Sequence, residues 1–291
     1  DEALRRLRAR VLKLFARLAQ LRGDQALVEQ VVRLQAKRRT IVKSRVDRAL
    51  ATLLELQLVD VSHQQRAAEI ARIIDRVAAI EGELRRLCAA GPQVRFQVDV
   101  DALSRIEAPR DRIAATEQAL THRPDVRAAA SRVGGAEAGA YVARGSAWPW
   151  FTWAQLGHTL PGSLGAGGFG VTLEVPLLCW KRGQIKRADA QVRLRRIEEQ
   201  AAVRDVVHEI DEAIERVAAT AGYARRLEAG LVAELDAAVQ LATRASDGGA
   251  LDPLRLVELE IERVEARRRH LAALLEHREA VIDLEAAMAT R

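Results

Sequence analysis

Apolar residues recur at steps of three and four over most of this chain, and this rhythm restricts its fold more than any other feature. It begins with Leu4, Leu7 and Val11 and continues to about Leu87, and such spacing places apolar side chains on one face of a helix. Aromatic residues make up only 3% of the sequence, which is typical of long helices rather than of an aromatic-centred enzyme core. We therefore expect a mainly α protein of long antiparallel helical hairpins.

Residues 1–91 are expected to form the first helical hairpin. Its turn is placed near Arg48–Thr52, although no glycine or proline marks that position. The second arm runs from about Leu54 to Leu87, and Gly91 and Pro92 follow it. Residues 92–122 are expected to be a connector, within which 93–100 (QVRFQVDV) alternates as an extended segment does.

Residues 148–176 have a different character. The stretch WPWFTWAQLGHTL is followed by the glycine-rich PGSLGAGG and then by FGVTLEV, a pattern typical of two strands joined by a long loop. In the second strand, Phe169, Val171 and Leu173 share one face, whereas Thr172 and Glu174 share the other. One face therefore suits lipid and the other suits water, as in a membrane β-hairpin.

A second helical hairpin is expected over residues 184–288. Its first arm is one long helix from about Gln184 to Ser246, which Gly249 follows. Asp252 and Pro253 provide an N-cap and a first-turn proline for the last helix, which reaches about Met288. In the same way, Pro124 is expected in the first turn of a helix that ends near residue 145.

The two helical turns resemble each other in sequence. Residues 49–56 (ALATLLEL) lie 200 positions before residues 249–256 (GALDPLRL), and each stretch precedes a long helix. We infer an internal helix-strand-strand-helix repeat, with 123–291 as its second copy and 1–91 as the second part of its first copy. The missing first part is expected upstream of Asp1, because the chain begins in helical rhythm and without a signal-peptide cleavage site.

The sequence argues against several classes of protein. The net charge of +6 is spread along the helices, without a basic stripe or a DNA-reading motif, so nucleic acid is not an expected partner. Cys88 and Cys179 have no CxxC motif and no histidine at ligand spacing, so neither a metal site nor a disulfide framework is expected. Nucleotide-binding GxxxxGK[ST] and hydrolase GxSxG motifs are also absent from the sequence.

The histidines are the remaining candidates for chemistry. His270 and His277 share a helical face, and His208 lies beside Glu209. Without an HExxH motif or a convergent third ligand, we expect surface histidines on polar helix faces. We therefore predict that the protein is not an enzyme and has no catalytic residue, no cofactor and no metal.

Several segments resemble those of a known family. Residues 123–129 (RPDVRAA), with Glu137–Ala138 and Ala143–Arg144 beyond them, are similar to a characteristic segment of the TolC-like outer-membrane efflux proteins. Residues 170–177 (GVTLEVPL) resemble that family's strand ending in VPL, and 249–258 resemble its periplasmic turn. The order of landmarks agrees from Arg123 to Met288, whereas Asp1–Leu87 is similar only in general character. A looser resemblance is to the CzcC-like heavy-metal branch.

This resemblance implies a channel component. Three identical protomers would close their strands into one β-barrel in the cell outer membrane, and their helices would extend into the periplasm as a tunnel. The homotrimer would be a passive conduit in RND-type drug or heavy-metal export, or in type I secretion. Its partners would be a periplasmic adaptor (membrane fusion) protein, an inner-membrane pump and outer-membrane lipid. The alternative is a soluble coiled-coil scaffold or adaptor protein.

The resemblance also implies where functional residues lie. Aromatic side chains expected at the membrane interface are Trp148, Trp150, Trp153 and Trp180. Residues expected at the periplasmic gate and adaptor-docking turns are Glu55, Gly249, Asp252, Arg255 and Glu258. Arg255 would pair with Glu258 and hold the gate shut, or both would be ordinary exposed helix charges. Ala49 departs from the family, which usually has glycine there.

Overall fold

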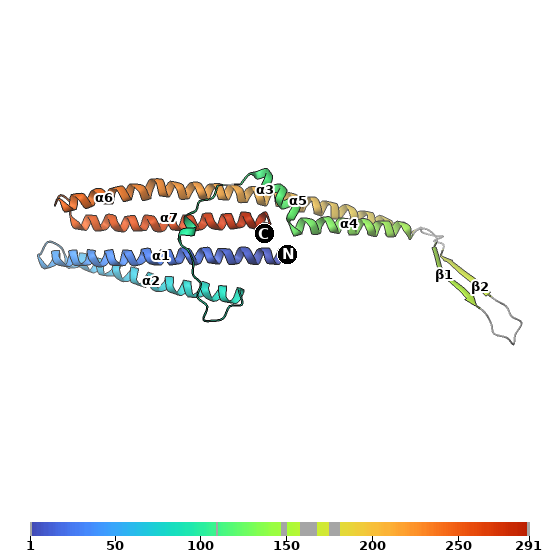
Figure 1. Cartoon of the computed structure of the whole chain (residues 1–291), viewed down its shortest axis with the longest axis horizontal. Helices are drawn as coiled ribbons and strands as arrows, with labels where there is room; N and C mark the ends of the chain where they lie inside the picture. Colours follow the sequence, from blue (N-terminus) through green and yellow to red (C-terminus); the bar gives the residue numbers. More distant parts are fainter. Residues whose placement is uncertain (1, 109, 147–149, 158–167, 175–180, 290–291) are drawn as a thin grey trace. The chain divides into compact units, whose positions relative to one another are not determined.

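The computed structural model divides the chain into two compact units (Figure 1). The first unit comprises Asp1–Thr116 and Glu209–Arg291, and the second comprises Glu117–His208. The structure describes all residues except 1, 109, 147–149, 158–167, 175–180 and 290–291. None of the described helices combines the length and the apolar character that a membrane-spanning helix needs.

Two helical hairpins form most of the first unit. One consists of α1 (Glu2–Asp47) and α2 (Leu53–Leu87), and the other of α6 (Ala233–Asp247) and α7 (Pro253–Ala287). α1 packs along both α2 and α7, and α6 packs along α7. Figure 1 shows the two turns at the same end of this unit. The predicted antiparallel helical hairpins are therefore present.

The approach to the second hairpin differs from the prediction. We expected one helix from about Gln184 to Ser246, but α5 (Arg182–Arg226) leads into α6 through a π-helical segment, Leu227–Val232. A π-helical segment is one slightly wider turn within a helix. Such a turn takes in about one extra residue, a shift too small to be read from the apolar rhythm of a long helix.

Small and branched side chains fill the core of the first unit. One cluster joins Ala19 of α1, Ala224 of α5 and Leu274 of α7, and it also contains Leu103. Leu103 belongs to a short 3-10 helix, Asp101–Ser104, in the segment between α2 and α3 (Arg112–His122). This segment has no strand at residues 93–100, and it covers the helical bundle through side chains such as Leu103.

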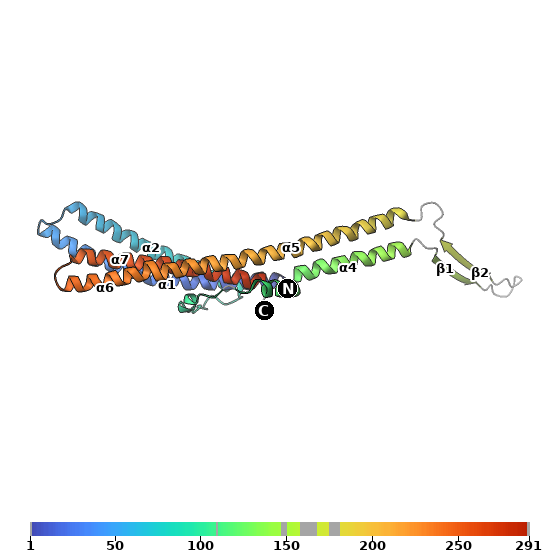
Figure 2. The same cartoon turned by 90° about the horizontal axis from the view of Figure 1, so that it is seen from above.

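The second unit contains an antiparallel helix pair. α4 (Pro124–Gly145) runs along the first part of α5, as Figure 2 shows. Two ion pairs of 2.7 Å join them, Arg144 to Asp189 and Arg196 to Glu137. Pro124 lies in the first turn of α4, as predicted.

The Arg-Pro-Asp segment has a structural role at the start of α4. The Arg123 side chain, only 5% exposed, folds back on Asp125, with 2.7 Å between Nη2 and Oδ2. This hydrogen bond holds the pKa of Asp125 below its ordinary value. Pro124 between them fixes the backbone for helix initiation. The three residues therefore form a local helix-start motif.

Two strands follow α4 within the range expected for the hairpin. β1 (Trp150–Gly157) and β2 (Gly168–Glu174) pair in antiparallel fashion. Phe151 lies opposite Leu173 and Leu156 opposite Phe169, with an irregularity in register between Phe151 and Trp153. Their backbone pairing thus gives a two-stranded sheet between α4 and α5.

Candidate functional site: the paired helical turns

The two helical turns have the same backbone geometry at positions 200 residues apart. At the end of α1, Leu50 N–H donates to Arg45 O over 2.8 Å, and Ala250 N–H donates to Ala245 O over the same distance at the end of α6. Ala49 (φ 59°) and Gly249 (φ 72°) both have left-handed backbone conformations. The turns are therefore built alike, although only one has the glycine that this conformation favours.

Helix limits keep the same offset beyond the turns. α1 and α6 end at Asp47 and Asp247, and the next helices span residues 53–87 and 253–287. Each of these helices is followed, two residues after its last residue, by an alanine with positive φ: Ala89 (50°) and Ala289 (53°). The likeness between the two hairpins thus extends over whole helices.

A side-chain cap starts each second arm. Thr52 and Glu55 form a capping box, in which Thr52 Oγ1 accepts from Glu55 N and the Glu55 carboxylate accepts from Thr52 N. Asp252, at the equivalent position of α7, accepts from Leu254 N over 3.0 Å. Glu55, predicted as a gate residue, therefore has a structural task at the helix start.

Ion pairs join the two hairpins near these turns. Arg45 of α1 donates to the Asp252 carboxylate, which thus binds both its own helix and α1. The Arg45 guanidinium and the Leu254 amide hold the pKa of Asp252 below its ordinary value. Farther along, Arg38 of α1 lies 3.2 Å from Glu258 of α7.

Glu258 is shared between two arginines. Besides Arg38, it accepts from Arg255 one turn earlier on α7, also over 3.2 Å. The predicted pairing of Arg255 with Glu258 is therefore present within one chain. The Arg255 side chain is 73% exposed, so this contact by itself adds little to stability, whereas the Arg38 contact connects α1 with α7.

Exposed leucines surround the first turn. The sequence analysis did not identify these leucines as functional residues. Leu50, Leu53, Leu54 and Leu58 are between 59% and 73% exposed. Large apolar side chains gathered on a surface typically mark an interaction site. The sequence signal was the close spacing of these leucines around the break between α1 and α2.

The predicted interfacial tryptophans are only partly described. Trp150 and Trp153 belong to β1, whereas Trp148 and Trp180 lie outside the described residues. Their role at a membrane interface stays a prediction.

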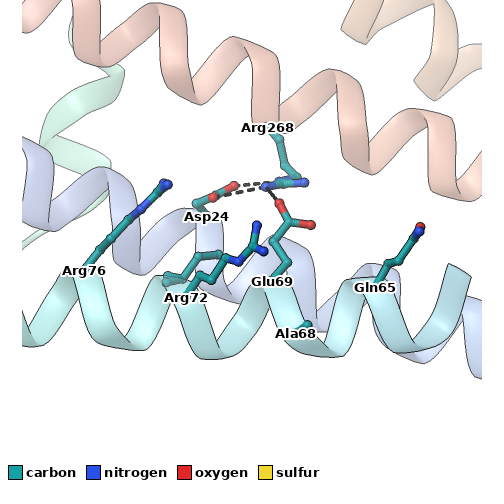
Figure 3. Close-up of a pocket in the computed structure, with 8 residues that line it drawn as sticks. Asp24, Gln65, Ala68, Glu69, Arg72, Arg76 and Arg268 are labelled. Atoms are coloured by element: carbon teal, nitrogen blue, oxygen red, sulfur yellow. Dashed lines mark hydrogen bonds and ion pairs between the residues drawn. The ribbon is translucent and has the colours of Figure 1, made fainter. Parts of the chain in front are cut away.

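Beyond the turns, a polar pocket lies at the meeting of α1, α2 and α7 (Figure 3). Its volume is about 370 Å³, and Arg268 projects into it from α7. Arg268 Nε donates to Asp24 of α1 and Nη2 to Glu69 of α2, both over 2.6 Å. Burial alone lowers the pKa of Arg268, but these hydrogen bonds outweigh it and raise the pKa above its ordinary value. One guanidinium thus joins three helices.

The surface location predicted for the histidines is wrong for His277. Its side chain is buried, with 1% of the residue exposed, and its Nε2 lies 3.1 Å from the backbone N of Glu107. His270 is half-buried, and His208 is exposed as expected. Among the described residues, no three His, Cys, Asp or Glu side chains gather as a metal site would require.

Comparisons with known proteins give the fold a context. No protein-family model matches the chain, and no curated protein has a matching sequence. Solved structures do match: the outer-membrane channel OprN has a TM-score of 0.76 at 17% identity, over 100% of this chain and 67% of that chain. The outer membrane protein VceC from Vibrio cholerae has a TM-score of 0.75 at 19% identity, over 98% and 70% respectively.

A third match is the MtrE outer membrane channel of Neisseria gonorrhoeae, with a TM-score of 0.74 and 17% identity. It covers 99% of this chain and 67% of that chain. The chain thus spans about two thirds of the length of these proteins. At this identity a match over nearly every residue establishes architecture, and the chain has the fold of outer-membrane channel proteins.

Proposed function

We propose that this chain is a protomer of a TolC-family outer-membrane channel in a tripartite efflux system. The observation that carries the proposal is the match of nearly the whole chain to structures of the outer-membrane channels OprN and MtrE. The strand pair between α4 and α5 supports it, because such channels need strands as well as long helices. The channel would be a passive conduit, extending from the outer membrane into the periplasm.

The strands would provide the membrane part of this conduit. Backbone groups of a strand in lipid must pair with neighbouring strands, so only a closed barrel is stable there. β1 and β2 have eight and seven residues, close to the 9 to 11 or so that cross a bilayer when tilted. Trp148, Trp150, Trp153 and Trp180 would then lie at its interfaces, where indole rings are favoured.

The helical turns would form the periplasmic gate and the adaptor-docking end. In a homotrimer, three copies of Gly249, Asp252, Arg255 and Glu258 would converge with Glu55 of the first turn. The ion pairs of Asp252 with Arg45 and of Glu258 with Arg38 support this assignment, because they fix the position of one hairpin relative to the other. A ring of such charges would select among permeating ions.

The partners would provide what the channel lacks. An inner-membrane pump would supply the energy, and a periplasmic adaptor would connect it to the helical turns. The cargo would be that of the pump: drugs or heavy metals in RND-type export, or a protein in type I secretion. The exposed leucines at the first turn support docking at this end.

The proposed domain organisation rests on an internal repeat. We infer that 1–91 is the second part of a first repeat, that 92–122 is the connector, and that 123–291 is the second repeat. Within it, 148–176 would be the β-hairpin and 184–288 the helical hairpin. The 200-residue offset between helix ends and between positive-φ residues supports this division.

Cell fractionation and ion selectivity test the proposal. A protein that carries this chain preceded by a second strand pair is expected in the outer-membrane fraction, in a form that detergent is needed to extract. In open channels, Arg255→Glu is expected to shift the ratio of cation to anion permeability towards cations, and Arg216→Glu, far from the turns, to leave it unchanged. A protein that stays in the aqueous fraction would instead favour the soluble coiled-coil scaffold or adaptor.

A further inference from the structure

His277 is enclosed where three segments of the first unit meet. It lies on α7 and is 1% exposed. Its Nε2 is 3.1 Å from the backbone N of Glu107, in the segment between the 3-10 helix and α3. A backbone N–H can only donate, so Nε2 must accept, and the ring proton must be on Nδ1.

The other ring nitrogen is satisfied in the same protonation state. Nδ1 lies 3.2 Å from Oγ1 of Thr220 on α5, and that hydroxyl donates onward to Arg216 O over 2.8 Å. The hydroxyl thus accepts from Nδ1–H while it donates to the carbonyl oxygen. The neutral imidazole therefore satisfies both contacts, and it connects α5, α7 and residue 107.

A second proton would break this arrangement. Protonated Nε2 carries its own N–H and cannot accept from Glu107 N, so two donors would face each other in a buried place. An unpaired buried donor is destabilising, because it has lost its hydrogen bonds to water and gained none in return. The strain can be relieved if the backbone of Glu107 moves away from α7.

Burial, neighbouring charges and a hydrogen bond together set the pKa of the His277 ring. Burial is the largest influence and lowers the pKa of His277, and Arg225 of α5 and Arg278 of α7 act in the same direction. The Glu107 carboxylate and a hydrogen bond to the Val217 backbone oppose them, and Arg278 already binds that carboxylate over 2.7 Å. The balance is a pKa below the ordinary value of about 6.5.

We propose that His277 is a proton-sensitive contact, called here the pin, which holds the backbone at Glu107 against α5 and α7 when neutral and releases it when protonated. His277 takes up a proton less readily when it binds the Glu107 amide than when this contact is broken. The contact is therefore most stable well above pH 6.5, and its stability declines as the pH falls below that value. This inference concerns the helical unit alone, so its failure would leave the channel proposal standing.

Hydrogen exchange of the Glu107 amide tests the pin. In this chain, the protection factor of that amide, corrected for the intrinsic pH dependence of exchange, is expected to fall at least tenfold between pH 7.5 and pH 5. His277→Gln offers an oxygen that accepts without titrating, so protection in this variant should be the same at both values. His208→Gln, at an exposed position, is the matched control and should respond like the wild type.

Two results would overturn the inference. One is equal protection of the Glu107 amide at both pH values in the wild type, and the other is a wild-type fall that persists in His277→Gln. If His277→Gln does not fold, as judged by circular dichroism, NMR titration of the His277 ring in the wild-type protein decides. A ring pKa at or above 6.5 would also contradict the pin.

Discussion

At the scale of residues, one carboxylate at the second turn performs two tasks. Asp252 caps α7 through Leu254 N and binds Arg45 of α1. Its counterpart, Thr52, caps α2 without a charge and forms a capping box with Glu55. Two cap types at equivalent positions therefore start similar helices, but only Asp252 also ties the two hairpins together.

Substitution of Asp252 separates these tasks. Asp252→Ala removes both the cap and the ion pair, and it is expected to lower the free energy of unfolding by about 1 kcal/mol. Asp252→Asn keeps a capping oxygen and loses the charge, so a clearly smaller loss is expected, because exposed ion pairs contribute little. Urea unfolding followed by circular dichroism measures both. Equal losses would show that the ion pair, not the cap, is decisive.

The same carboxylate predicts a dependence on pH. Arg45 lowers the folded-state pKa of Asp252, so its contribution is complete above the unfolded value of about 3.9 and is lost as the pH falls through the folded value. The difference in unfolding free energy between wild type and Asp252→Asn should therefore shrink below about pH 4. A difference that grows with acidity would contradict this assignment.

Local signals explain which residues were predictable. Pro124, Asp252 and Pro253 were placed correctly, because a cap or first-turn proline acts on its own helix. The capping box of Thr52 and Glu55 was missed, although the spacing T-x-x-E was in the sequence. His277 could not be placed, since the segment that buries it lies 170 residues earlier.

At the scale of elements, the two turns form a natural matched pair. Ala49 and Gly249 share a left-handed conformation, which costs an alanine roughly 1 kcal/mol or more and glycine almost nothing. A side chain added at Gly249 would meet no atom within 4 Å, so only backbone strain would matter there. The sequence rhythm indicated both breaks, but it could not show their backbone angles.

Exchanging these two residues should have opposite effects. Ala49→Gly relieves the strain of the left-handed conformation, but it also makes the unfolded chain more flexible, which favours unfolding. The net effect expected is a stabilisation of up to about 1 kcal/mol. Gly249→Ala is expected to destabilise it by about 1 kcal/mol. Thermal unfolding of the two variants measures the sign. Changes of the same sign would mean that the turns do not share one geometry.

Helix packing in the first unit depends on the ion pairs of Arg268 with Asp24 and Glu69 as well as on apolar contacts. Arg268→Met would leave Asp24 and Glu69, which are 14% and 30% exposed, without their shared partner. A loss of about 1–3 kcal/mol in unfolding free energy is expected, as for partly buried groups that lose a hydrogen-bonded partner.

The matched control is Arg216→Met, which removes an ion pair to Glu212 within one helix. The Arg216 side chain is 53% exposed, so a change within about 0.5 kcal/mol is expected. Chemical denaturation of both variants gives the comparison. Similar losses of unfolding free energy at the two positions would show that the ion pairs of Arg268 contribute no more to stability than an exposed ion pair does.

At the scale of the whole molecule, the strands limit what the chain can form by itself. Each copy has two described strands, so a trimer would bring six, whereas the smallest outer-membrane barrels have about eight. The proposed repeat suggests how the number of strands per protomer can rise. With the 200-residue offset, residue 202 corresponds to residue 2, so a segment like 117–201 placed before α1 would add a second strand pair. The sequence suggests this repeat through eight aligned positions, and the helix limits 53–87 and 253–287 keep the same 200-residue offset.

Single-channel recording in planar bilayers tests the channel proposal most directly. The chain would be compared with a version in which a duplicate of residues 117–201 precedes α1. We expect stable trimers with discrete conductance steps from the extended protein and none from the chain by itself. If neither protein inserts or conducts, while both fold with long helices by circular dichroism, this chain is not a channel protomer.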